Sequence, residues 1–235
     1  MKVSEEIFRT YKPDFQKLLS FGFTEEKGCY KLSRTFFGGA FTAEVTVLYS
    51  GETAVKVIEN EFGDEYVQVN NENFDGAFVG EVRTALKEIL TDIRDNAFNK
   101  QSFVSDQANR LERIINGKYN EFADYPFSDV KFRDYGVFRR KDNGKWYALV
   151  MNVERKVLGK DYKNEPGRLD IINLKVDEKQ RDELVKKGGI IPSYHMNKQK
   201  WISVFLDESL SDEFIINLLD TSRELVKSKT KRSKK

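Results

Sequence analysis

The dipeptide Asn143-Gly144 stands between two runs with strand character, Tyr135–Lys141 and Lys145–Val153. Asn followed by Gly is the preferred pair for a type I′ turn, whose backbone twist suits a two-residue hairpin. Hairpins join antiparallel strands, whereas parallel strands need a crossover of a dozen or more residues. The sequence therefore predicts an antiparallel sheet in the second half of the chain, with a charged hairpin tip.

The rest of the second half alternates helix and strand patterns around that hairpin. Ser105, Asp177 and Ser211 stand where helix N-caps are expected, and Gln180 has the spacing of a capping-box partner for Asp177. The expected elements are a helix over 105–116 stopped by Gly117, strands over 135–141, 145–153 and 167–176, a helix over 177–187, a strand over 201–206 and a helix over 211–226. With the extended run before Trp201, they give the order α-β-β-β-α-β-β-α.

A shorter pattern of the same kind fills the first half. Ser4 is the expected N-cap of a helix that Pro13 kinks or restarts and that Gly22 ends. Strands are expected over 29–37, 41–49 and 53–58, with an edge strand over 66–69. Asp75 is expected to cap a long helix over 75–93, whose apolar residues form one wide stripe. We interpret this stripe as core-facing.

A polar stretch without periodicity, residues 96–102, separates the two halves. A domain boundary there gives an N-terminal α-β-β-β-α domain over 1–99 and a C-terminal domain over 100–228. Residues 229–235 contain only Lys, Arg, Ser and Thr, and a disordered basic tail is expected over them. The predicted fold class is α+β, with two domains that are each an antiparallel sheet packed by helices.

The composition excludes several classes of protein. Cys29 and His195 are the only residues of their types, which excludes an intrachain disulfide and the usual His/Cys zinc site. No apolar run approaches the roughly 20 residues that a membrane span needs, and residues 1–9 lack the apolar core of a signal peptide. These features indicate a cytoplasmic protein that contacts no membrane.

The sequence motifs of common enzyme classes are also absent. The chain has no phosphate-binding or dinucleotide-binding glycine loop, no H-E-x-x-H, no G-x-S-x-G and no C-x-x-C. Carboxylates are plentiful, but no spacing marks a catalytic pair. We therefore expect a protein that is not an enzyme, with no catalytic residue, no metal and no cofactor.

One segment of the chain identifies a family. It is Ile190-Ile191-Pro192-Ser193-Tyr194-His195-Met196-Asn197-Lys198 with Trp201, preceded in order by Asp124–Phe127, Val137–Arg140, Asp142–Leu149 and Asp170–Lys175. Over roughly residues 101–228, these segments resemble the MmcQ/YjbR family of small bacterial proteins. The preceding residues resemble, more weakly, the extra N-terminal domain of YyaQ-type members. The resemblance implies a secretion-chaperone-like fold and DNA binding, the role usually ascribed to the family.

Basic residues gather at two turns of the C-terminal domain. The hairpin tip carries Arg139, Arg140, Lys141 and Lys145, and the turn before Trp201 carries Asn197, Lys198 and Lys200. Lys and Arg hold phosphates without reading bases, so these two turns together are the expected nucleic-acid surface. Ordinary solvated turns are the alternative, since charged hairpin tips also aid solubility. The six basic residues of 227–235 add either phosphate contacts or solubility alone.

Three side chains of the family segment, Tyr194, His195 and Trp201, have both a structural and a ligand-binding interpretation. A lone His needs a nucleophile or an orienting acid for catalysis, and the sequence shows neither beside it. A hydrogen bond from the ring of His195 to a backbone carbonyl would instead pin an irregular segment. Tyr194 and Trp201 are expected in or beside the core, with base stacking as the alternative.

Charge is distributed unevenly along the chain. Residues 1–100 hold 12 Lys and Arg against 17 Asp and Glu, whereas residues 101–235 hold 28 against 21. The acidic half is a poor surface for DNA. Two hypotheses follow. The first is a DNA-binding protein that contacts the phosphate backbone through its basic turns. The alternative is a protein-interaction or small-ligand-binding module with no nucleic-acid role.

Overall fold

The computed structural model describes residues 2–71, 73–129 and 131–228, and the chain divides into two compact units, Met1–Gln101 and Ser102–Lys235. They are called the N-terminal unit and the C-terminal unit below. The boundary expected from the sequence lies between residues 99 and 100. The basic tail expected over 229–235 lies outside the described residues.

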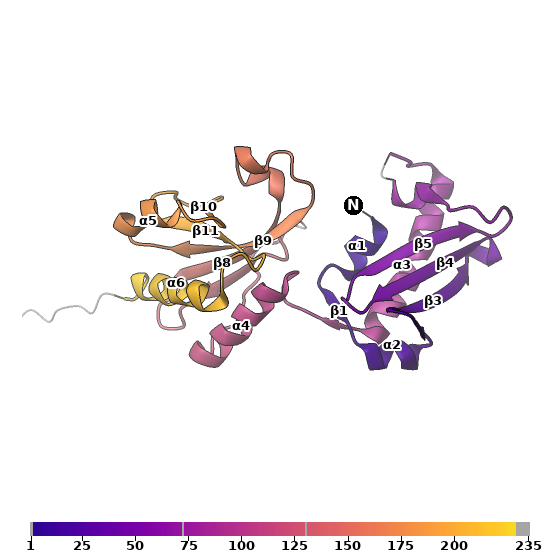
Figure 1. Cartoon of the computed structure of the whole chain (residues 1–235), viewed down its shortest axis with the longest axis horizontal. Coiled ribbons are helices and arrows are strands. Elements are labelled where there is room, and N and C mark those ends of the chain that lie inside the picture. The colour runs from indigo at the N-terminus through magenta and orange to yellow at the C-terminus, as the bar shows by residue number, and fades with distance from the viewer. Residues whose placement is uncertain (1, 72, 130, 229–235) are drawn as a thin grey trace, which may run out of the picture. The chain divides into compact units, whose positions relative to one another are not determined.

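The N-terminal unit packs helices against one face of an antiparallel sheet (Figure 1). Its helices are α1 (Val3–Phe8), α2 (Phe15–Phe21) and α3 (Ala77–Ala97), with short 3-10 turns η1 (Phe37–Gly39) and η2 (Val67–Asn70). Its four-stranded sheet runs β2-β3-β4-β5, with β2 (Thr24–Glu26), β3 (Cys29–Phe36), β4 (Phe41–Leu48) and β5 (Thr53–Glu59). The alternating inward residues of β4 share one core with Val82, Leu86, Leu90 and Ile93 of α3, so the core-facing interpretation is confirmed for these residues. It is wrong for Phe78, at the start of the stripe, which is exposed.

Pro13 restarts the first helix instead of bending it. It ends a short strand, β1 (Tyr11–Pro13), which pairs antiparallel with β6 (Phe98–Lys100). Asp14 then caps α2 by accepting from the backbone N–H groups of Gln16 and Lys17, and Gly22 ends α2 with a φ of 111°. Strand β6 lies in the polar stretch, residues 96–102, in which the sequence predicts the domain boundary and no strand. Strands of three residues are too short to show a period of two.

Three further expectations for the N-terminal unit are wrong, for two physical reasons. Helix α1 begins before Ser4, since the backbone N–H of Val3 donates to Asn70, 67 residues away (3.3 Å). The expected edge strand over 66–69 is the 3-10 turn η2, because the guanidinium of Arg83 donates to the carbonyls of Gln68 and Val69. Gly76, and not Asp75, is the N-cap residue of α3, so this N-cap has no side-chain hydrogen bond.

The C-terminal unit has a five-stranded antiparallel sheet in the order β10-β11-β9-β8-β7. Its strands are β7 (Gly136–Arg139), β8 (Trp146–Glu154), β9 (Arg168–Lys175), β10 (Ile190–Pro192) and β11 (Trp201–Phe205). Its helices are α4 (Asp106–Tyr119), α5 (Glu178–Leu184) and α6 (Asp212–Leu225), with 3-10 turns η3 (Arg155–Val157) and η4 (Lys160–Tyr162). The order α4-β7-β8-β9-α5-β10-β11-α6 is the predicted one, and the fold class is α+β.

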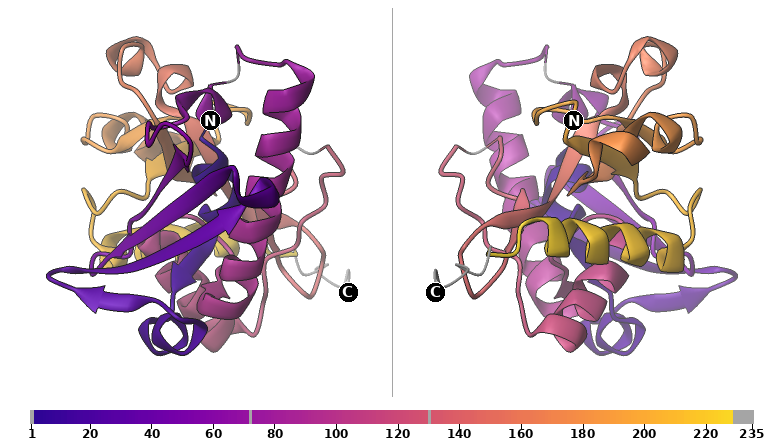
Figure 2. Two further views of the ribbon diagram at one scale, coloured as in Figure 1. Left: turned by 90° about the vertical axis from the view of Figure 1, so that its right-hand side faces the viewer. Right: turned by 90° about the vertical axis from the view of Figure 1, so that its left-hand side faces the viewer.

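Helices cover one face of this sheet, and loops cover the other. Helices α4 and α6 lie side by side on the first face (Figure 2), where Leu111 and Ile215 share a core with Ile172 and Val204. The opposite face packs against the side chains of Phe127, Phe132 and Tyr162, which come from loops and η4. Ser105, Asp177 and Ser211 cap their helices with side-chain hydrogen bonds, which confirms those three predictions.

Two turn predictions in the C-terminal unit are wrong. Gly117 lies inside α4, which ends at Asn120 in the left-handed region (φ 52°). The hairpin between β7 and β8 is a longer loop, residues 140–145, in which Gly144 (φ 67°) has a positive φ but Asn143 does not. The side chain of Asn143 instead donates hydrogen bonds to Val226 and Ser228, which follow α6.

Candidate nucleic-acid interface

The loop of residues 140–145 is closed by its own backbone and holds the end of the described chain. The N–H of Gly144 donates to the carbonyl of Arg140 (2.8 Å), and the N–H of Arg140 donates to the carbonyl of Lys145 (3.0 Å). The amide nitrogen of Asn143 donates to the carbonyl of Val226 (2.9 Å) and to Oγ of Ser228 (3.1 Å). The basic stretch that begins at Lys227 therefore starts beside the hairpin loop.

Arg140 is buried, so its expected role in phosphate contact is wrong. Its side chain is 8% exposed. The guanidinium forms a two-pronged pair with Asp142 (2.9 Å and 2.9 Å) and donates to the carbonyl of Arg223 (3.1 Å). It also pairs with Glu224 (3.4 Å). These bonds join the hairpin loop to the end of α6, which makes Arg140 a structural residue.

Arg139 also has partners, although it is more exposed than Arg140. Its Nε donates to Asp124 (2.9 Å), and its guanidinium lies 5.1 Å from the ring centroid of Trp146. Trp146 belongs to the loop-covered face of the sheet, where it packs against Phe127. Arg139 thus fixes the segment around Asp124 to β8, and it is not a free cation at the hairpin tip.

Four lysines of the two turns have exposed side chains: Lys141, Lys145, Lys198 and Lys200. Within residues 2–71, 73–129 and 131–228, the amino groups of the first three form no ion pair, and that of Lys200 lies 3.6 Å from Glu178. Asn197 shapes its turn, since its side-chain oxygen accepts from the N–H of Gln199 (2.9 Å). The four lysines are called the lysine end below.

Strand register places the members of the lysine end at one end of the sheet. Trp201 pairs with Lys175 at the start of β11, and Ala148 pairs with Leu174 near the start of β8. Both turns therefore project beyond the same end of β9. Strands β8 and β11 flank β9, so their starts are separated by two strand spacings, about 10 Å.

A buried polar network fixes the turn that carries Lys198 and Lys200. The side-chain nitrogen of Asn173 donates to the carbonyl of Tyr194 (2.7 Å), and the N–H of Tyr194 donates to Oγ of Ser203 (2.9 Å). Ser203 Oγ in turn donates to the side-chain oxygen of Asn173 (2.5 Å). Asn173 and Ser203 are fully buried. The sequence analysis missed both, although a polar residue at an inward strand position was a usable signal.

This network replaces the role expected of His195. The side chain of His195 is exposed, its φ is 62°, and its ring lies against that of Tyr194, with centroids 3.9 Å apart. No described residue accepts a hydrogen bond from the imidazole, so the ring does not pin the segment. Tyr194 is half-buried and Trp201 is buried, both as parts of the core margin.

A second polar network is centred on the buried carboxylate of Glu121. It holds the hairpin loop through the backbone N–H of Lys141. The Glu121 carboxylate accepts hydrogen bonds from two nitrogens of the Arg223 guanidinium (3.0 and 2.8 Å), from the hydroxyl of Tyr147 (2.8 Å) and from the N–H of Lys141 (3.1 Å). Burial opposes ionisation, but these hydrogen bonds outweigh it and lower the pKa of Glu121. Glu121 was not a predicted site residue.

The lowered pKa of Glu121 predicts a pH-dependent contribution to stability. The ionised carboxylate stabilises the fold fully above the ordinary glutamate pKa of about 4.3, and this contribution is lost as the pH falls through the lower folded-state pKa. The stability advantage of the wild-type chain over Glu121→Gln should therefore shrink between about pH 5 and pH 3. Urea unfolding of both chains at several pH values measures it; a constant difference would contradict it.

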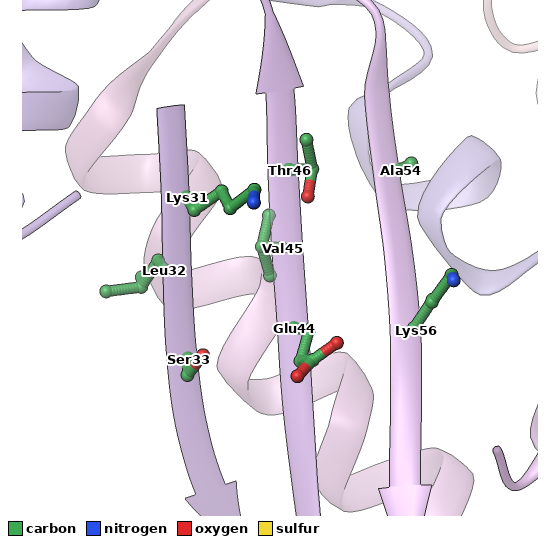
Figure 3. Close-up of a pocket in the computed structure, with 8 residues that line it drawn as sticks. All are labelled: Lys31, Leu32, Ser33, Glu44, Val45, Thr46, Ala54 and Lys56. Atoms are coloured by element: carbon green, nitrogen blue, oxygen red, sulfur yellow. The ribbon is translucent and has the colours of Figure 1, made fainter. Parts of the chain in front are cut away.

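A hollow lies on the N-terminal unit, on the side of its sheet away from α3 (Figure 3). Its volume is about 310 Å³, and Ser33, Thr46 and Ala54 form its floor between Lys31 and Lys56. Lys31 is paired with Glu26 (2.6 Å). Charged and polar side chains line the hollow together with apolar ones, and it lies in the unit that does not contain His195.

Comparison with known proteins identifies the family. The YjbR family model matches residues 118–225. The uncharacterized protein YyaQ of Bacillus subtilis is 38% identical over 113 residues, which are 48% of this chain and 92% of YyaQ. The chain belongs to the YjbR family. The 113 matched residues are 92% of YyaQ, so YyaQ is too short to contain counterparts of both units of this chain.

Two solved structures are also similar to this YjbR-family chain. A crystal structure of a Pseudomonas syringae protein is 40% identical and covers 50% of this chain and 97% of its own, with a TM-score of 0.47. A Deinococcus radiodurans protein is 26% identical and covers 55% and 81%, with a TM-score of 0.38. Among the residues described here, no helix combines the length and apolar character of a bilayer span, and no cluster of three metal-ligating side chains occurs.

Proposed function

We propose that the C-terminal unit is a non-enzymatic DNA-binding module that contacts the phosphate backbone through the lysine end. The observation that carries the proposal is the strand register: turns some 55 residues apart in sequence, at 141–145 and 198–200, project from the same end of β9. The start of the basic C-terminal stretch lies there too, because Asn143 binds Val226 and Ser228. The lysines of the two turns thus stand at one edge together with Lys227, which pairs with Glu224 (3.2 Å).

The chemistry of these residues suits backbone contact without base recognition. A lysine ammonium is a mobile point charge that tolerates any phosphate position within its reach. The arginines that are able to grip phosphates with two donors, Arg139 and Arg140, are already bound to carboxylates. Binding is therefore expected to be weak, independent of DNA sequence and sensitive to salt, with a slope of about −0.9 per neutralised phosphate.

The alternative of a protein-interaction module has support of its own. Acidic side chains stand among the cations of this edge, with Asp142 on Arg140 and Glu178 near Lys200. Such pairing lowers the local positive potential that DNA needs. A small-ligand role has less support, since the hollow described above is open and lies on the N-terminal unit.

Replacing Lys141, Lys145, Lys198 and Lys200 together by Gln is expected to abolish most of the affinity for duplex DNA. Four lost phosphate contacts would make the plot of log affinity against log salt shallower by up to about 3.6. Fluorescence anisotropy of a labelled duplex between about 50 and 200 mM salt measures both quantities. The affinity for duplexes of different sequence should fall equally.

A matched control removes the same charge elsewhere. Lys27, Lys56, Lys160 and Lys163 are also exposed, and replacing these four by Gln gives a chain of identical net charge. This control should keep nearly all of the affinity. An equal loss in both variants would mean that total charge, and not the lysine end, governs binding. No retention of duplex DNA by the wild-type chain at about 50 mM salt would refute the proposal and favour the protein-interaction alternative.

A further inference from the structure

One end of the N-terminal unit has aromatic side chains that reach solvent. Phe78, in the first turn of α3, is 53% exposed, and its ring lies 5.5 Å from that of Phe37 and 6.3 Å from that of Phe41, measured between centroids. The ring of Phe41 also contacts Tyr66 (4.9 Å). The exposed rings thus continue a buried aromatic cluster to the surface, which separates them from isolated exposed apolar residues.

Two neighbouring segments extend this surface. The loop after β5 is tied to the turn at η1, because Asn60 donates to the carbonyl of Gly39 (2.7 Å) through its side chain and to that of Ala40 (2.9 Å) through its N–H. Phe62 of that loop is 69% exposed. In η2 and the residues before α3, Val67 and Phe74 are exposed as well.

The backbone conformation of Phe37 indicates that the fold holds this ring in place at the surface. Its φ is 54°, in the left-handed region that bulky residues rarely adopt, and Gly38 and Gly39 follow with positive φ. The turn thereby holds the Phe37 ring against Phe78 (5.5 Å) and leaves it half-buried. A residue without a large side chain would satisfy the same turn with less strain.

Acidic residues outnumber basic ones around these rings. Residues 57–82 contain seven Asp and Glu and no Lys, Arg or His. The described acids of this range are Glu59, Glu61, Asp64, Glu65, Asp75 and Glu81, and none of them pairs with a cation elsewhere in the described chain. Arg83, which directly follows this range, donates to backbone carbonyls, including those of Val69 and Phe74. The rings of Phe37, Phe62, Phe74 and Phe78 and these six carboxylates are called the acidic aromatic surface.

We propose that the acidic aromatic surface binds a basic, amphipathic segment of a partner protein, with apolar side chains on the exposed rings and Lys or Arg on the surrounding carboxylates. Exposed Phe rings provide the apolar contacts and cation–π faces that such a segment requires. The negative charge repels a nucleic-acid backbone, so DNA is a poor occupant. This interaction is independent of the lysine end, which belongs to the other unit.

The test uses the full chain and three synthetic fluorescent peptides of about 18 residues. One has Lys and Leu at amphipathic helical spacing, one has Lys and Ser at the same positions, and one has Glu and Leu. Anisotropy at about 100 mM salt is expected to show binding of the Lys/Leu peptide at least tenfold tighter than the Lys/Ser peptide. The Glu/Leu peptide is expected not to bind.

Two variants locate the binding. Phe62→Ala with Phe78→Ala should weaken the Lys/Leu peptide at least tenfold, and Glu61→Gln with Asp64→Asn and Glu65→Gln should weaken it and flatten its salt dependence. Circular dichroism verifies that each chain is folded, and the charge variant leaves all packing rings in place. The matched controls change exposed residues elsewhere on the same unit: Leu19→Ala with Leu48→Ala for the rings, and Glu5→Gln with Glu52→Gln and Glu88→Gln for the three acids.

The proposal is supported if both variants at the acidic aromatic surface weaken the peptide and both controls leave it unchanged. It is overturned if the Lys/Leu peptide does not bind, or if it binds no better than the Lys/Ser peptide. Equal losses in the control variants overturn it too. The proposal is also overturned if the chain binds duplex DNA and the Phe62→Ala and Phe78→Ala changes abolish that binding.

Discussion

Replacing Glu121 by Ala is expected to lower the unfolding free energy of the C-terminal unit by about 3–5 kcal/mol, the usual cost of removing one partner from a buried ion pair. The side chain of Arg223 is 17% exposed, and that of Glu121 is 2% exposed. Without the carboxylate, Arg223 keeps its charge with little solvent to replace the partner. The hydroxyl of Tyr147, also buried, loses its acceptor.

The protein carries its own probe for this measurement. Trp146 and Trp201 are its only tryptophans, and both belong to the C-terminal unit. Tryptophan fluorescence during urea unfolding therefore reports this unit alone. Replacing the exposed Glu213 of α6 by Ala is the matched control and should cost less than about 1 kcal/mol, the upper value for an exposed first-turn acid.

A double variant identifies the origin of the loss. If the cost comes from an uncompensated charge, adding Arg223→Met to Glu121→Ala should restore part of the stability, because it removes the charge and fills the space. A cavity at residue 121 would instead make the two losses add. A loss below about 1 kcal/mol in the single variant would show that another group replaces the carboxylate.

Features that depend on residues close together in sequence could be predicted, whereas features that depend on distant residues could not. Helix caps such as Ser105 and Ser211 bond N–H groups three residues away, so local sequence contains the whole motif. The short pair β1–β6 joins residues more than 80 positions apart, and neither strand has a periodic pattern of its own. The wrong assignment of residues 66–69 to a strand has the same cause, since Arg83 holds that turn from α3.

The candidate site shows the same difference between local and long-range interactions. The positions of the two basic turns at strand ends could be predicted, because each turn lies between elements that the sequence marks. The burial of Arg140 could not, since its partners on α6 lie more than 80 residues away. The four basic residues of the predicted hairpin tip are thus two structural arginines and two exposed lysines in the folded chain. Charge counting along the sequence overstated the surface available to phosphate.

Replacing Asn173 by Ala is the second change with a large expected effect. It leaves the carbonyl of Tyr194 without its donor and Oγ of Ser203 without its acceptor, both in or beside the core. At about 1–3 kcal/mol for each of these two groups, the C-terminal unit should lose about 2–6 kcal/mol. Urea unfolding followed by tryptophan fluorescence measures this loss, and Asn164→Ala, at an exposed position, is the matched control.

The change at Asn173 also tests whether the turn must be rigid to serve the lysine end. Because the network fixes Tyr194, its loss should raise the hydrogen-exchange rate of the backbone over residues 194–200 more than that of β8. If the fixed turn positions Lys198 and Lys200 for phosphate, the Asn173→Ala chain, measured where it is still folded, should bind duplex DNA more weakly at the same salt slope. Lost stability with unchanged DNA affinity would mean that the network serves the fold alone. Long lysine side chains would then reach phosphates without a fixed turn.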